Sequence, residues 1–129
     1  MFTPHKGDHS GTMPWEYFPA AAGTYKAGQL LNVTSGKLAA ISEASKTTPP
    51  YLCMADITAA DGDNVPVVRV RSDRIFKTTL SAAAASAAVG TKLEVSAGGL
   101  EADAAAAGTF EVTALEGTAA GSTVYGRFA

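Results

Sequence analysis

Two histidines near the start of the chain are the first residues whose type and spacing could do chemistry. His5 and His9 stand four residues apart, with Asp8 between them. Histidines at this spacing can share a metal ion when both lie on one face of a helix. Pro4 and Gly7 disfavour a helix here, so a solvated segment is the preferred interpretation. We therefore expect no metal and no cofactor.

The single cysteine is the second candidate for chemistry. Cys53 lies in the apolar run 51–54, a setting typical of a small buried hydrophobic side chain. A catalytic thiolate, the alternative, would need a histidine nearby as its base. Both histidines lie within the first nine residues, far from Cys53 in the sequence. One cysteine also allows no intramolecular disulfide.

Motifs that carry enzymatic chemistry are missing from the sequence. It contains no Gly-x-Ser-x-Gly, no glycine-rich phosphate loop and no dinucleotide fingerprint. From residue 25 onward there is no histidine, so proton transfer near neutral pH would need another group with a shifted pKa. We expect no catalytic residues and no enzymatic activity.

Four basic residues near the middle of the chain form the clearest charge pattern: Arg69, Arg71, Arg74 and Lys77. The chain after them is mainly acidic, so these residues are candidates for charge contacts within the fold or between subunits. A net charge of −2 gives no general attraction to nucleic acid or to an anionic membrane. No run approaches the ~20 apolar residues of a membrane span. We expect neither nucleic acid nor a membrane as a partner.

The elements that must position these residues are mostly strands. From Tyr25 onward, short apolar runs are separated by Gly, Asn, Asp and Ser, which is typical of an all-β domain. Residues 29–34 and 37–42 around Ser35-Gly36 predict a hairpin. The expected architecture is mostly all-β, a compact β-barrel or β-sandwich. Further strands are expected at residues 51–58, 65–72, 74–79, 92–96, 100–102, 110–115 and 123–129.

Residues 80–89, LSAAAASAAV, predict the one short helix of the domain. Alanine is the best helix former, and Gly90 follows where a glycine commonly ends a helix. Because so short a helix is marginal alone, we expect it to pack on the sheet.

The first 24 residues differ from the rest of the chain. They hold Pro4, Pro14 and Pro19 and show neither helical nor strand periodicity; dense proline disfavours a helix and a central strand. We therefore divide the chain into an extended N-terminal arm, residues 1–24, and a β-rich domain, residues 25–129. The aromatic residues of the arm are its candidate partner-binding residues: Phe2, Trp15, Tyr17 and Phe18.

Ordering this arm requires more than burial of its aromatic side chains. Four of them return about 6–12 kcal/mol, whereas fixing ten backbone residues costs about 10–20 kcal/mol. Backbone hydrogen bonds are needed as well, most simply by strand addition or by docking in a groove. Docking on a neighbouring subunit is the preferred interpretation, and packing on the chain's own domain is the alternative.

Four stretches, taken in order, carry a resemblance to a known family. They are residues 23–31 with 36–38, residues 50–52 with 59–70, the alanine-rich run with 89–93, and residues 108–112 continuing through Gly121 to Phe128. In this order they resemble tailed-phage capsid decoration proteins, also called cement or head-stabilising proteins. The resemblance covers roughly residues 23–129 and depends on the order of the elements more than on any one motif.

The resemblance implies a small β-rich structural protein that binds the outer face of an assembled bacteriophage capsid and stabilises it without catalysis. The implied partners are the major capsid protein and further copies of the chain, commonly as a homotrimer, and the implied location is the capsid exterior of the virion. The arm lies outside the resemblance. The alternative is a virion-displayed β-domain that binds a carbohydrate or a host receptor through exposed aromatic residues.

Overall fold

The computed structural model describes residues 1–7, 15–41, 50–96, 98–104 and 108–128. Over these residues the protein is all-β, with 13 strands in three sheets and no helix. Every strand pair is antiparallel. This confirms the expected all-β class. Short apolar runs between turn residues form strands that are joined by short turns.

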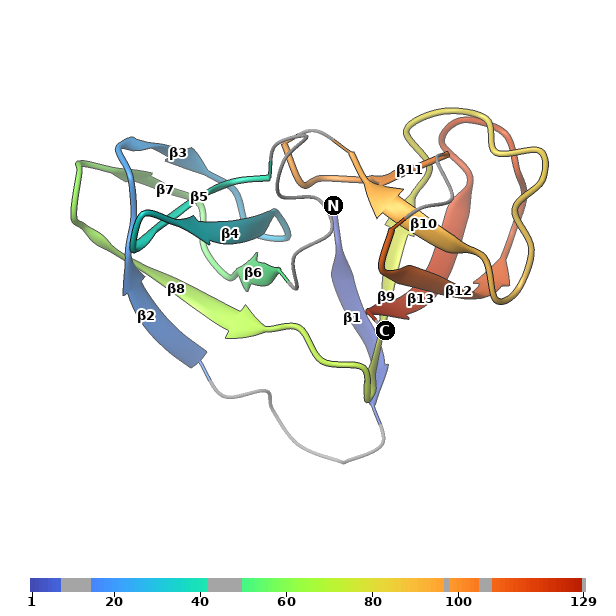
Figure 1. Ribbon diagram of the computed structural model, residues 1–129, viewed down its shortest axis with the longest axis horizontal. Coiled ribbons are helices and arrows are strands. Elements are labelled where there is room, and N and C mark those ends of the chain that lie inside the picture. The colour runs from blue at the N-terminus through green and yellow to red at the C-terminus, as the bar shows by residue number, and fades with distance from the viewer. Residues whose placement is uncertain (8–14, 42–49, 97, 105–107, 129) are drawn as a thin grey trace.

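Two larger sheets and one small sheet make up the fold (Figure 1). The six-stranded sheet runs, in spatial order, through β1 (Thr3–Gly7), β9 (Arg74–Thr79), β13 (Thr123–Phe128), β12 (Phe110–Leu115), β10 (Lys92–Val95) and β11 (Ala102–Asp103). The five-stranded sheet runs through β2 (Trp15–Pro19), β8 (Asn64–Arg69), β6 (Tyr51–Cys53), β4 (Leu30–Thr34) and β5 (Lys37–Ala40). The small sheet pairs β3 (Gly23–Tyr25) with β7 (Ile57–Ala59).

The sheets do not close into the barrel that the sequence allowed. The five-stranded sheet comes nearest to closure, because Ala20, just after β2, forms an isolated parallel bridge with Leu38 of the opposite edge strand, β5. One bridge is not a ladder, so among the residues that the structure describes both edge strands keep most of their outer backbone unpaired. Edges left open in this way can accept another strand.

Two hydrophobic clusters lie on opposite faces of the five-stranded sheet. On one face Leu30, Leu52 and Val68 pack against side chains of the six-stranded sheet. On the other face Leu31 and Val67 pack under the small sheet. Neighbouring residues of a strand face opposite sides, so the consecutive apolar residues of β4 and β8 supply both clusters. The six-stranded sheet contributes a row of aromatic rings to the first cluster: Phe76, Phe110 and Phe128.

The helix predicted at residues 80–89 is not formed, and this prediction was wrong. The amide of Ser81 donates to the carbonyl of Ala102, and that of Ala84 to the carbonyl of Thr118, each at 2.8 Å. Leu80 and Ala84 are buried in the first cluster. A short alanine run gains little from an isolated helix, so hydrogen bonds to distant segments of the chain and burial of Leu80 decide its conformation.

The described part of residues 1–24 lies in the sheets of its own chain. β1 pairs with β9 and β2 pairs with β8, each as an edge strand of a different sheet. Edge positions tolerate proline, which explains how Pro4 and Pro19 fit into strands. The expected boundary between residues 24 and 25 falls inside β3. Within one chain, therefore, these residues pack on their own domain.

Candidate interaction surface

The candidate arm residue Phe2 lies in the core. It is 1% exposed, and its ring centroid lies 5.4 Å from that of Phe110 and 5.7 Å from that of Phe128. Its amide donates to the carbonyl of Gly28 at 2.9 Å. In this position Phe2 cannot contact a partner.

Trp15 and Tyr17 have the opposite environment. Both lie on β2 and are 47% and 62% exposed. They stand two residues apart, so they project from the same face of the strand, opposite Val68 and Pro66 of β8 in the register. We call this pair the β2 aromatic face. It combines exposed rings with an open strand edge, and it can therefore bury aromatic area and accept backbone hydrogen bonds from a partner.

The other face of β2 is held against its own sheet. The ring of Phe18 meets that of Tyr51 edge-on, with centroids 5.2 Å apart. The guanidinium of Arg69 lies 5.2 Å from the centroid of Tyr51, and its Nε is 3.6 Å from a carboxylate oxygen of Glu16. These contacts fix the orientation of β2, and with it the orientation of the β2 aromatic face.

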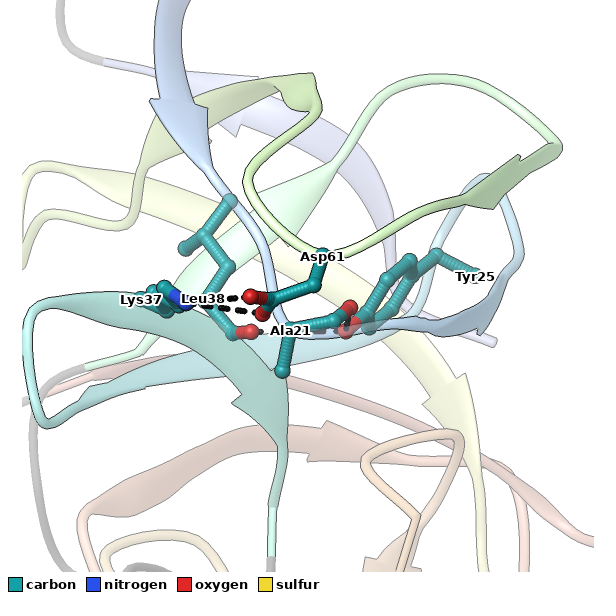
Figure 2. A network of polar contacts seen from close by, with 5 residues as sticks. All are labelled: Ala21, Tyr25, Lys37, Leu38 and Asp61. Atoms are coloured by element: carbon teal, nitrogen blue, oxygen red, sulfur yellow. Dashed lines mark hydrogen bonds and ion pairs between the residues drawn. The ribbon is translucent and has the colours of Figure 1, made fainter.

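The end of β2 is tied down by a polar network (Figure 2). The hydroxyl of Tyr25 donates to the carbonyl of Ala21 at 2.6 Å and lies 3.3 Å from the carbonyl of Leu38. Close by, the ammonium of Lys37 donates to both carboxylate oxygens of Asp61, at 2.7 and 2.8 Å. Burial, and then the neighbouring Cys53, raise the pKa of Tyr25 above its ordinary value, so this hydroxyl keeps its proton well into the alkaline range.

The four basic candidates are distributed over both large sheets. Arg69 ends β8, whereas Arg74 and Lys77 belong to β9. Arg71 lies between these strands, with its Nε 3.7 Å from a carboxylate oxygen of Asp73. β8 and β9 belong to different sheets, so Arg69 lies in one large sheet and Arg74 and Lys77 lie in the other. Arg69 is the one of the four for which a contact with β2 is shown, and that contact, with Glu16, is on the face of the strand opposite to the β2 aromatic face.

Cys53 is a free, buried thiol, as the sequence predicted. Its Sγ lies 3.1 Å from the carbonyl of Ala55, and burial raises its pKa. A raised pKa opposes thiolate formation, and this microenvironment is the reverse of that around a reactive cysteine.

The candidate metal ligands of the N-terminal segment are not seen together. The ring centroids of His5 and Tyr125 lie 4.7 Å apart. Asp8 and His9 lie outside the described residues. No group of three or more His, Cys, Asp or Glu residues in the described part of the chain could hold a metal ion. Across that same part, no helix is long and apolar enough to cross a membrane.

Sequence reasoning missed Tyr51 and Glu16 as neighbours of Arg69. Their contacts depend on the register of β2 and β6 on β8, which a single sequence does not reveal.

No protein-family model matches the chain, and no curated protein matches it.

Proposed function

We propose that the protein is a non-enzymatic structural protein that binds the outer surface of an assembled bacteriophage capsid and stabilises it. The observation that carries the proposal is the β2 aromatic face: two large exposed rings on an open edge strand. Tryptophan and tyrosine are enriched among the residues that dominate binding energy at protein interfaces. The order of the sequence motifs from residue 23 onward, which resembles that of tailed-phage capsid decoration proteins, supports the same function.

The partner in this proposal is the major capsid protein, and the location is the capsid exterior. The N-terminal region docks on neighbouring subunits through β2, while Phe2 and Phe18 hold it to its own domain. Arg69, with its side chain 58% exposed beside β2, can contribute a charge contact. A homotrimer would present three such surfaces, and linked contacts raise avidity by about 10²–10⁴ when the geometry allows.

The test is binding of a Trp15→Thr/Tyr17→Thr double variant to capsids assembled from the major capsid protein encoded with this chain. Threonine removes the rings but keeps a residue type that favours strands. Residues that dominate interfaces cost at least about 2 kcal/mol each when truncated. We therefore expect the affinity of each bound copy for the capsid to fall at least ~30-fold. The matched control is Val33→Thr, because Val33 is also an exposed apolar residue on a strand. Unchanged binding of the double variant would exclude this surface.

The β2 aromatic face also supports the second candidate, a virion-displayed domain that binds a carbohydrate or a host receptor. Two rings spaced two strand residues apart lie about 7 Å from each other along the strand, a separation that suits stacking of sugar rings. Four of the six aromatic residues from Tyr25 onward are less suitable because they are buried: Tyr25, Phe76, Phe110 and Phe128. Glycan binding by the intact protein that is lost in the double variant, without any binding to capsids, would favour this alternative.

A further inference from the structure

The segment 1–7 binds the rest of the chain by strand addition and by insertion of one side chain, the way in which a peptide ligand binds a sheet edge. Phe2 inserts between the two large sheets, and β1 then adds to the free side of β9. We call the surface that holds this segment the β1 site. We propose that the β1 site accepts the same segment from a second copy of the chain, so that two copies exchange residues 1–7. This inference does not depend on the proposed function.

The β1 site is built by residues from many other parts of the chain. Phe110 and Phe128 supply the ring contacts to Phe2, and Gly28 accepts its amide hydrogen bond. A shallow hollow of about 220 Å³ adjoins the site, bounded by residues 1–4, 27–28 and 52–54. All contacts between the segment and this site are non-covalent. They are therefore the same whichever copy supplies the segment.

Gly28 shows how closely the β1 site fits this particular segment. Its φ is +87°, and a Cβ added there would stand 3.0 Å from both the Cβ of Met1 and the carbonyl oxygen of Phe2. Any side chain at position 28 would therefore press on the first two residues. The segment that occupies the site in this structure is the chain's own residues 1–7, so a second copy carries the same occupant.

The hold on β1 is also local enough to be released without unfolding the sheets. β1 has one neighbour, and its register on β9 is interrupted between Pro4 and Lys6. The side chains of Thr3, Pro4 and His5 are exposed, and Phe2 is the one deeply buried residue among residues 1–5. Release of the segment exposes one buried ring and breaks the β1–β9 hydrogen bonds, and binding to a second copy restores both. Exchange of such an element between identical chains is a low-cost route to association.

The register supplies a direct test by disulfide trapping, because Thr3 lies opposite Lys77. In a Cys53→Ala background, a Thr3→Cys chain and a Lys77→Cys chain are mixed in denaturant, refolded together and oxidised. Exchange predicts a disulfide-linked heterodimer at several times the level of a control mixture. The control pairs Thr3→Cys with Val89→Cys, since Val89 is 70% exposed and is not part of β1 or β9. Heterodimer at the control level would overturn the proposal.

A single chain carrying both Thr3→Cys and Lys77→Cys provides the check on geometry. It is expected to form an intramolecular disulfide when refolded at high dilution. Absence of that disulfide would mean that β1 does not lie on β9 in this register, and the proposal would fall with it.

A second measurement needs no cysteine variant. A labelled peptide with the sequence of residues 1–7, MFTPHKG, is incubated with the full-length protein. We expect it to be captured at least tenfold more strongly than the same peptide carrying Phe2→Ala, because Phe2 supplies the buried contacts. Equal capture of the two peptides would count against an exchangeable β1 site.

Discussion

β1 and β2 come from the same proline-rich stretch, and both became edge strands, yet their aromatic residues have opposite environments. Phe2, next to β1, is 1% exposed, whereas Tyr17 of β2 is 62% exposed. The start of β1 lies where the two large sheets meet, so its ring enters a cluster of other rings. β2 lies at an outer edge. Aromatic content alone therefore does not identify a partner-binding segment, because the position of each strand decides which rings remain exposed.

The largest effect should come from removing the ring that holds β1. Phe2→Ala should destabilise the protein by about 3–5 kcal/mol, the usual cost of emptying a fully buried phenylalanine site. The measurement is the free energy of unfolding from urea titration. A loss below about 1 kcal/mol would mean that β1 is not part of the stable core, and the contrast with β2 would disappear.

The next effect should come from Gly28, which tests whether β1 needs its close approach to that residue. Alanine in a left-handed conformation costs about 1–2 kcal/mol, and Gly28→Ala adds pressure on Met1 and Phe2. Gly62→Ala is the matched control, because Gly62 has a φ of +90° but no atom near its added Cβ. We expect Gly28→Ala to be the more destabilising in the same urea titration, and equal losses would contradict the fit described for the β1 site.

Alkaline pH should lower the free energy of unfolding by a smaller amount, through the thiol of Cys53. This residue lies between the β1 and β2 regions. Cys53 pairs with Val67 in the sheet that carries β2 and borders the hollow beside residues 1–4. Burial raises its pKa above the ordinary value of 9.0, so the folded protein holds this proton more tightly than the unfolded chain. The free energy of unfolding should therefore be insensitive to this group below about pH 9 and should decrease as the pH rises above it.

The control for the pH response is Cys53→Ala, whose free energy of unfolding is measured across the same pH range. The pKa of Tyr25 is also raised, from its ordinary value of 10.0. Part of the decrease in the free energy of unfolding should therefore persist in this variant. Identical slopes between pH 9 and 10 for the two proteins would show that Cys53 contributes nothing.

The smallest effect on stability should come from the β2 aromatic face. Tyr17→Thr keeps a strand-favouring residue and should change the free energy of unfolding by no more than about 0.5 kcal/mol, as is usual for surface substitutions. A large loss in the urea titration would show that this ring supports the fold. In that case β1 and β2 would be alike, and weakened binding of the double variant would no longer report on a contact surface.

Much of the fold could be predicted from local sequence. The strands expected at residues 74–79 and 110–115 have the observed bounds, and the predicted hairpin is formed by β4 and β5. Its turn residues Ser35 and Gly36 both have positive φ, 52° and 77°, as a two-residue hairpin turn of this kind requires. These features were predictable because they depend on neighbouring residues alone.

Other features depend on residues far away in the sequence. Strict alternation along the strand 110–115 would place Ala114 on the same face as Phe110 and Val112, but a register shift after Val112 leaves it exposed. A β-bulge of this kind inserts one residue and changes which face the following residues use. The pairing of Arg69 with Glu16 and Tyr51 was not predictable for the same reason, since it requires the register of three strands.

The sequence by itself determined that this chain is all-β, where its central strands and turns lie, and that Cys53 is buried. Those properties follow from apolar spacing and turn chemistry, which act over a few residues. The tertiary structure decided that residues 80–89 are not helical, that Phe2 is a core residue and that Trp15 and Tyr17 are exposed. The physical reason is that hydrogen bonds and burial between distant segments override local propensity, and those contacts exist only once the sheets have assembled.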